Sequence, residues 1–577
     1  MSTNKQAGAD MSTYQTLRAM HEAVEANIDP LGMAMPLMHA QLAWLSHPQE
    51  LAEAASAFAT RMMALQWHSW QRMLGLPSTD VEMPNPDDTR FADPIWTDAA
   101  SWDVTKEWYL SFTHHIQDML YQTPGLSNRD RRRAAFWWRK WLNAMAPTNF
   151  LLTNPVAMRK AVETNGDSLV RGMSNFFADL KAGNVRMTRP DDFKVGQNLA
   201  TTPGKVVLRN RLLEVIHYTP VATETYRTPI LIVTPWINKF YILDLTPKKS
   251  LVKFLLEQGF DVYITSWKNP DASMAEVGFD DYLIEGVDAA VEAVRSVAKS
   301  NKIHTVGYCI GGAALASYMA WANRRYAEKD VPVASATFFT TLVDYHKPGD
   351  IEVFLDEGSF TYLARNMAQK GYLDGKEMAA AFRLLRSNSL IWHYVVHGYL
   401  YGEAPPPFDV LFWNMDTTRM PARMHTWYLR NLYLDNKLIR KDALEVAGQP
   451  LDLTRIVQPV YAVAAADDHI APWQQAFRIN NFVSGSKRFV LSSSGHILGI
   501  INPVVNPPKR DYWVAAAERH DTAEEWQEKA EHHAGSWWED WMTWLKPQSG
   551  GLGKPQAIGN KRYPALADAP GAYVLEQ

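Results

Sequence analysis

Apolar residues recur every three or four positions through much of the first 180 residues. This spacing is typical of helices with one buried face, and it is clearest between about Gln15 and Gly75. The apolar positions there include Leu17, Met20, Leu42, Leu45, Met62, Met63, Leu65 and Trp67. A turn cluster, Thr201-Thr202-Pro203-Gly204, ends the pattern. We therefore predict a mainly helical N-terminal domain over residues 1–200.

Beyond residue 200 the pattern changes to short apolar runs separated by helical stretches. The runs, which predict strands, are 229–234, 261–267, 302–306, 333–339, 460–464 and 488–491. Such an alternation is typical of a doubly wound, mostly parallel sheet. An ordered segment rich in Leu, Trp, Tyr and Pro, at about 344–450, interrupts it. We expect 201–577 to form the α/β domain, with 344–450 inserted as a large cap over the carboxyl ends of the strands.

The one cysteine of the chain lies in Gly307-Tyr308-Cys309-Ile310-Gly311-Gly312, after a predicted strand and before an alanine-rich helix. A strand, a tight turn with glycines around a nucleophile, and a helix form the nucleophile elbow of α/β-hydrolases. The helix N-terminus also favours an anion at this position. Taken alone, the motif is a weak signal that favours a buried structural cysteine over a nucleophile.

An acid and a histidine follow in the order that an elbow enzyme requires. Asp468 comes after the strand 460–464, and His496 after the strand 488–491. We expect Cys309 to be the nucleophile, His496 its base and Asp468 the partner of the histidine. Asp467 is an alternative acid, and either aspartate could instead cap the next helix. The three residues in this order predict an α/β-hydrolase-type fold.

Two backbone amides are expected to form an oxyanion hole. One is that of Ile310, the residue after the nucleophile, and the other comes from the loop that follows the strand 229–234. In that loop, Trp236-Ile237-Asn238, we assign the second amide to Ile237.

Composition argues against several other functions. A net charge of −4 gives no sign of nucleic-acid binding, and no apolar stretch approaches the roughly 20 residues of a membrane span. A single cysteine suits a reducing compartment, so we expect a cytoplasmic protein. Adjacent histidines at 114–115 and 532–533 would point apart on a helix, so we expect no metal site. The 22 tryptophans indicate aromatic core packing or, alternatively, contact with an apolar ligand or surface.

A thiol in place of the usual serine bears on the substrate. Attack by Cys309 on an oxygen ester is uphill, whereas attack on a thioester is nearly isoenergetic and keeps the acyl group activated. A cysteine elbow beneath a water-excluding cap therefore favours acyl transfer from a thioester. Hydrolysis is the alternative if water enters.

Several long motifs resemble the active-site segments of polyhydroxyalkanoate synthases. Besides the elbow, they are Trp236–Leu245, Trp267–Met274, Asp409–Asn414, Asp468–Trp473 and Ser494–Ile497. The resemblance extends from about Trp141 to the C-terminus. Within the family, the chain resembles the class I enzymes, which have a single type of subunit. This resemblance implies polymerisation of (R)-3-hydroxyacyl-CoA, chiefly 3-hydroxybutyryl-CoA, through a thioester on Cys309, with release of CoA.

The resemblance also implies that Asp468, not Asp467, assists deprotonation of the incoming 3-hydroxyl group, directly or through His496. It further implies that Trp413, His469 and Asn238 contact the substrate. No cofactor is implied, because the CoA thioester is itself the substrate. Expected partners are the polyester granule, granule-coating proteins and a second copy of the chain, and the expected location is the cytoplasm at the granule. A thioesterase or depolymerase, or a non-catalytic granule-surface protein, is the alternative. Arg386-Ser387-Asn388-Ser389 departs from the family pattern within the predicted cap.

Overall fold

The computed structural model describes residues 29, 31–85 and 88–577, which divide into two units. The first, helical unit holds the described residues up to Arg189 together with 356–362 and 380–407. The second, α/β unit holds 190–355, 363–379 and 408–577. The helices expected between residues 15 and 28 lie outside the described residues.

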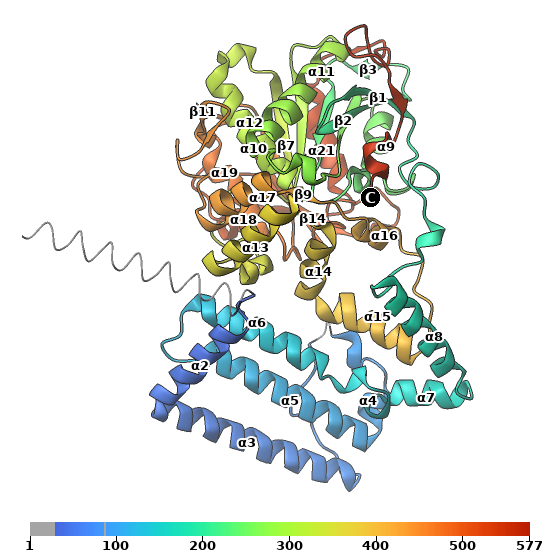
Figure 1. Ribbon diagram of the computed structural model, residues 1–577, viewed down its shortest axis with the longest axis vertical. Coiled ribbons are helices and arrows are strands. Elements are labelled where there is room, and N and C mark those ends of the chain that lie inside the picture. Colours follow the sequence, from blue (N-terminus) through green and yellow to red (C-terminus); the bar gives the residue numbers. More distant parts are fainter. Residues whose placement is uncertain (1–28, 30, 86–87) are drawn as a thin grey trace, which may run out of the picture. The chain divides into compact units, whose positions relative to one another are not determined.

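Long helices build the helical unit, as the apolar spacing predicts (Figure 1). They are α2 (Ala34–Ser46), α3 (Pro48–Met73), α5 (Ala100–Gln122), α6 (Asn128–Ala144), α7 (Pro155–Glu163) and α8 (Asp167–Ala182). Small side chains let α2, α5 and α6 approach closely, since Ala40, Ala134 and Ala135 pack with Leu120 in one buried cluster. The helices therefore associate through alanine contacts as well as through large apolar residues.

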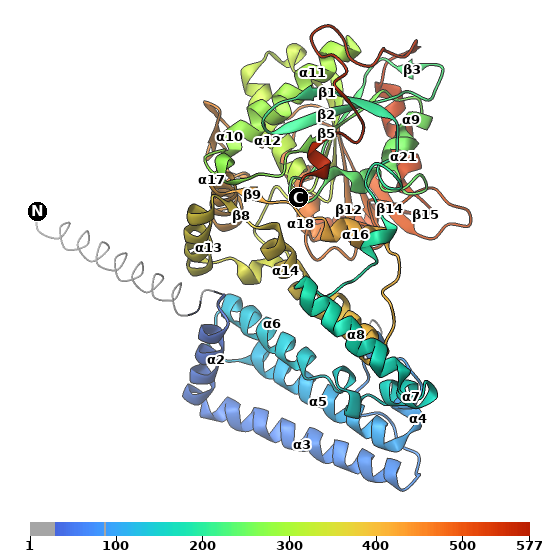
Figure 2. The same ribbon diagram turned by 45° about the vertical axis from the view of Figure 1, so that its right-hand side comes forward.

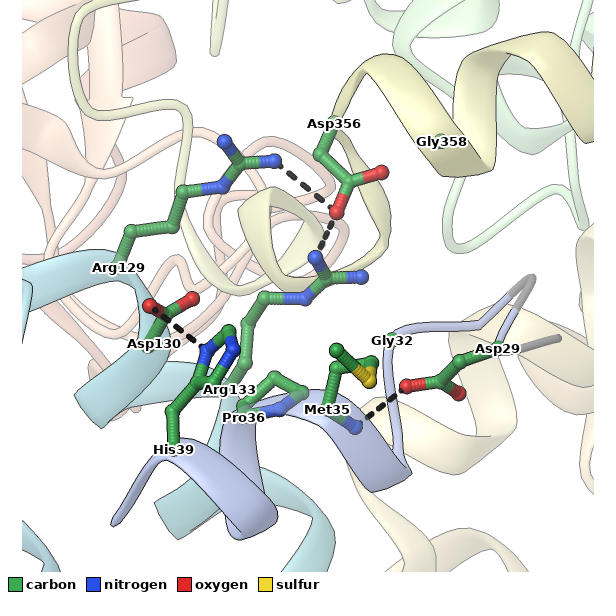
Figure 3. Close-up of a pocket in the computed structure, with 10 residues that line it drawn as sticks. All are labelled: Asp29, Gly32, Met35, Pro36, His39, Arg129, Asp130, Arg133, Asp356 and Gly358. Carbon is green, nitrogen blue, oxygen red and sulfur yellow. Dashed lines mark hydrogen bonds and ion pairs between the residues drawn. The ribbon is translucent and has the colours of Figure 1, made fainter. Parts of the chain in front are cut away.

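Arg133 of α6 joins three segments of the helical unit (Figure 3). Its buried guanidinium pairs with Asp356 and lies 3.2 Å from the Leu31 carbonyl oxygen and 3.3 Å from the Ser359 hydroxyl. Asp356 also accepts a 2.6 Å hydrogen bond from the Ser359 amide, which caps the start of α13 (Glu357–Lys370). A carboxylate thus fixes part of the predicted cap within the helical unit.

The predicted cap is divided between the two units. Residues 356–362 and 380–407 belong to the helical unit, and the rest of 344–450 belongs to the α/β unit. The latter part contains α16 (Asp409–Met415), α17 (Ala422–Tyr428) and a short antiparallel pair, β8 (Tyr372–Leu373) with β9 (Met420–Pro421).

An eleven-stranded sheet forms the centre of the α/β unit, in the order β15-β14-β13-β12-β7-β6-β4-β5-β2-β1-β17. The six predicted strands are confirmed and are mutually parallel: β4 (Ile230–Val233), β5 (Val262–Trp267), β6 (Ile303–Tyr308), β7 (Val333–Phe339), β12 (Val460–Ala465) and β13 (Lys487–Ser492). Antiparallel strands extend both edges: β1 (Gly204–Arg209), β2 (Leu213–Tyr218), β14 (Asp511–Ala516), β15 (Glu531–Ala534) and β17 (Ala567–Asp568).

Helices cover both faces of this sheet (Figures 1 and 2). On one face lie α9 (Leu251–Glu257) and α21 (Trp537–Leu545), and on the other α11 (Ala289–Ala298) and α12 (Ile310–Arg325). The tryptophans Trp537, Trp538 and Trp541 of α21 are at most 1% exposed and belong to the main core cluster. This tryptophan cluster is therefore core packing. The α/β-hydrolase-type sheet expected from the sequence is confirmed.

Candidate active site

Cys309 lies at a sharp turn between β6 and α12. Its φ of 52° is in the left-handed region, and its amide donates a 2.9 Å hydrogen bond to the Phe339 carbonyl oxygen. The flanking glycines are required by space: a Cβ on Gly307 would lie 2.5 Å from the Gly312 Cα, and a Cβ on Gly312 would lie 1.9 Å from the Thr341 hydroxyl oxygen. Strained backbone and crowded glycines are the features of a nucleophile elbow.

His496 and Asp468 meet in the loops after β13 and β12. The His496 Nδ1 lies 2.6 Å from the Asp468 Oδ2, and the other carboxylate oxygen accepts 2.9 Å hydrogen bonds from the amides of Ile470 and Ala471. Asp468 is 6% exposed, whereas Asp467 is an exposed residue. The geometry thus distinguishes between two aspartates that the sequence alone left open.

The third member of the group, Cys309, is hydrogen-bonded to the ring of His496. Since Asp468 occupies Nδ1, the thiol faces Nε2. Burial alone would lower the pKa of His496, but the charges of Asp468 and Cys309 and their hydrogen bonds raise it to about 10. The arrangement can therefore hold a thiolate beside an imidazolium ion, which is a strong nucleophile in neutral solution.

The two predicted oxyanion amides come from neighbouring segments. Ile310 is the first residue of α12, where amide N–H groups have no acceptor within the helix. Gly311 packs against the end of β4, since a Cβ on it would lie 2.5 Å from the Val233 carbonyl oxygen and 2.6 Å from that of Thr234. This contact brings the first turn of α12 against the loop that contains Ile237.

The residues predicted to contact substrate differ in their accessibility. Asn238 and His469 are partly exposed. Trp413 is 2% exposed, and its indole N–H donates a 2.7 Å hydrogen bond to the Lys239 carbonyl oxygen. The polar atom of Trp413 is thus already engaged within the protein.

Several residues around this site were not predicted from the sequence. Three tyrosines, the buried Tyr345 and Tyr428 and the partly buried Tyr433, contact one another and interact electrostatically with Cys309. Thr418 hydrogen-bonds the loop of Ile237. These residues come from segments far from the elbow in sequence and carry no motif, although the aromatic richness of 344–450 was a weak signal.

One cluster of the helical unit has the residue types of a metal site. Single ligand atoms of His68, Asp103 and Glu107 lie within 4.8 Å of one another, and all three residues are buried. However, the Lys106 ammonium lies 3.0 Å from one Asp103 oxygen, and the Arg72 Nε lies 2.5 Å from the other. Side-chain cations thus already neutralise this carboxylate, so we interpret the cluster as a buried ion-pair network.

Among the described residues, every helix is too short or too polar to cross a lipid bilayer.

The fold and the elbow define an α/β-hydrolase-fold protein, and the family description "alpha/beta hydrolase fold" matches residues 229–503. A second description, "Poly-beta-hydroxybutyrate polymerase (PhaC) N-terminus", matches residues 87–255. The chain is 37% identical to a poly(3-hydroxyalkanoate) polymerase subunit of Rhizobium etli, with 99% of this chain and 90% of the relative covered. It is 39% identical to the polymerase of Methylorubrum extorquens (92% and 88% covered) and 36% identical to that of Cupriavidus necator (98% and 95% covered). The chain belongs to the poly(3-hydroxyalkanoate) polymerase family.

Proposed function

We propose that this protein is an acyltransferase that polymerises (R)-3-hydroxyacyl-CoA, chiefly 3-hydroxybutyryl-CoA, into a polyester with release of CoA. The observation that carries the proposal is a cysteine at the elbow, hydrogen-bonded to a histidine that a buried aspartate holds, in a chain of the polymerase family. Cys309, His496 and Asp468 are the residues to which we assign the chemistry.

In the first half-reaction the Cys309 sulfur attacks the thioester carbonyl, and the amides of Ile310 and Ile237 stabilise the oxyanion. The C–S bond to CoA then breaks, and the CoA thiolate takes the proton of the His496 imidazolium. Acylation removes the negative charge of Cys309, which is one cause of the raised pKa of His496. The histidine therefore gives up its proton more readily at the step that requires it.

In the second half-reaction the neutral His496 accepts a proton from an incoming 3-hydroxyl group. The resulting oxygen nucleophile attacks the acyl thioester on Cys309, and a new ester bond forms as the thiolate leaves. Asp468 stabilises the imidazolium that forms at this step. Each transferred unit brings a hydroxyl for the next transfer, so the polyester grows. The activated acyl group comes from the CoA thioester, so we expect no cofactor.

The test is to incubate the purified protein with (R)-3-hydroxybutyryl-CoA beside the variant Cys309→Ala. We expect free CoA and turbid, insoluble polyester from the wild type, and neither from the variant. CoA release with only soluble hydroxy acid would instead identify a thioesterase. Absence of CoA release with this substrate and with longer acyl chains would contradict catalysis altogether.

We also propose that the helical unit contacts the polyester granule and its coat proteins in the cytoplasm. Met63, Trp67 and Trp70 of α3 and Leu74, which directly follows it, recur at helical spacing, and each is 58–67% exposed. A stripe of this kind fits an apolar solid surface.

The granule contact is tested with Trp67→Gln/Trp70→Gln and a control pair in the α/β unit, Val504→Gln/Val505→Gln. We expect only the α3 variant to remain in the supernatant when granules are sedimented. Equal sedimentation of both variants would contradict the proposal. We further propose that the active form is a homodimer, which sedimentation velocity measures directly.

A further inference from the structure

A buried threonine of the α/β unit contacts the backbone of the loop after β4. The Thr418 hydroxyl oxygen lies 2.7 Å from the carbonyl oxygen of Trp236 and 2.6 Å from that of Ile237. Thr418 is 5% exposed, so water does not compete for these contacts. The two carbonyls belong to consecutive peptide groups of the loop in which we place an oxyanion amide.

Peptide geometry converts this contact into an orientation of the amide. In a planar trans peptide the carbonyl and the N–H point in opposite directions. The carbonyl of Trp236 and the N–H of Ile237 belong to the same peptide group. Because Thr418 holds the carbonyl on its own side, the N–H of Ile237 points away from Thr418. The Ile237 carbonyl lies within reach of the same single hydroxyl hydrogen and is its alternative acceptor.

The side chain of Trp236 anchors the same loop from another direction. Its ring contacts those of Trp267 and Tyr282, with centroids 5.5 Å and 4.8 Å away, and Trp236 is 2% exposed. The peptide after Trp236 is thus held by the indole at one end and by the threonine hydroxyl at the other. Of these two anchors, the hydroxyl is the one that acts on the peptide group itself.

Thr418 is itself held in place. It lies two residues before β9, which pairs with β8, and the neighbouring Thr417 forms an isolated antiparallel bridge with Asn238. Gly375 packs against the backbone of Thr418, since a Cβ on that glycine would lie 2.6 Å from the Thr418 carbonyl oxygen. The hydroxyl therefore projects from a braced backbone rather than from a loose loop.

We propose that Thr418 is a positioning residue of the reaction, whose hydroxyl orients the Ile237 peptide so that its N–H stabilises the oxyanion formed on thioester attack. This inference rests on the proposed function of the site. Loss of one oxyanion donor lowers kcat by about 10²- to 10³-fold in other acyl-transfer enzymes, and misorientation of a retained donor has a smaller effect. We expect Thr418→Val to lower kcat by roughly 10- to 100-fold with little change in KM, because the contact matters in the transition state.

Thr418→Ser is the matched control, because it keeps the hydroxyl, and it should stay within about threefold of the wild type. Alkylation of Cys309 by iodoacetamide needs the thiol and His496 but forms no oxyanion, so its rate should be unchanged in Thr418→Val. The inhibition constant of a substrate analogue with a trifluoromethyl ketone in place of the thioester should rise by the same factor as kcat falls, because that compound forms a tetrahedral adduct.

Two results would overturn the proposal. The first is a turnover of Thr418→Val within threefold of that of the wild type. The second is a decrease in the alkylation rate that parallels the decrease in turnover, because it would show that the hydroxyl acts on Cys309 and His496. Should Thr418→Val fail to fold, Thr418→Cys offers a weaker donor of similar size for the same comparison. The comparison works with any thioester that the wild type consumes, so failure of the polymerase assignment is seen separately, in the wild-type products.

Discussion

Replacement of Asp468 by asparagine changes one atom at the centre of the site. The Oδ1 of an asparagine can still accept the amides of Ile470 and Ala471, but its NH2 group then faces the Nδ1 of His496, where a carboxylate oxygen now lies at 2.6 Å. To avoid two opposed donors, the ring must carry its hydrogen on Nε2, toward Cys309. In that tautomer the histidine cannot accept the thiol proton.

The structure also indicates the magnitude. Burial opposes the charged ring, yet the interactions with Asp468 and Cys309 raise the pKa of His496 from an ordinary 6.5 to about 10, a net effect of about 5 kcal/mol in favour of the imidazolium. If the carboxylate contributes most of it, its loss lowers the rate by about 10³- to 10⁴-fold, as the equivalent change does in serine-protease triads. CoA release measured with a thiol reagent tests this figure.

The pH dependence of alkylation tests the cause. The raised pKa of His496 keeps the imidazolium present at neutral pH, and the imidazolium is lost only as pH rises through about 10. In Asp468→Asn we expect slow alkylation at pH 7 that recovers as the pH is raised. The exposed neighbour provides the control, Asp467→Asn, which should behave as the wild type. Coincident alkylation profiles for Asp468→Asn and the wild type, with turnover reduced less than tenfold, would refute the reasoning.

Three further predictions concern the fold around the site. Gly311→Ala should reduce CoA release at least tenfold, because the new Cβ would lie 2.5 Å from the Val233 carbonyl oxygen, whereas Gly551→Ala, with nothing within 4 Å, should be neutral. Asp356→Asn leaves the buried guanidinium of Arg133 unpaired and should lower the free energy of unfolding in urea by about 3 kcal/mol, and Asp130→Asn, whose His39 contact is 3.6 Å long, by less than about 1 kcal/mol. Burial lowers the pKa of His304 to about 4, so its contribution to stability is present above about pH 6.5 and lost as pH falls toward 4. Between pH 7 and pH 5, the free energy of unfolding in urea should therefore decrease by about 2 kcal/mol more in the wild type than in His304→Gln. Equal decreases in the two proteins would contradict this.

The central strands and the catalytic group could be predicted because their signals are local. A parallel strand buried on both faces, such as Ile230–Val233, is a continuous apolar run, and the elbow around Cys309 requires glycines at fixed positions. The antiparallel edge strands, such as Glu531–Ala534, were not predicted, because short strands with exposed polar residues have no distinctive pattern.

The division of the insertion could not be predicted for a different reason. A hydrophobic pattern shows that a helix has a buried face but not which partner covers that face. The pairing of Arg133 with Asp356 joins residues far apart in sequence, and no local signal reveals it. Thr418 is similar, since only the folded chain shows that its hydroxyl meets the carbonyls of Trp236 and Ile237.

The interleaving of the two units has a consequence for how the chain folds as it is synthesised. The polypeptide passes from one unit to the other at 189/190, 355/356, 362/363, 379/380 and 407/408. Domains usually fold in order from the N-terminus as they leave the ribosome. Here the helical unit cannot be completed until residue 407 has emerged. By then the strands β1, β2, β4, β5, β6 and β7 of the central sheet are already available to pair. Neither unit is a separable module, and a fragment that ends near residue 189 would lack the two later segments that complete its packing.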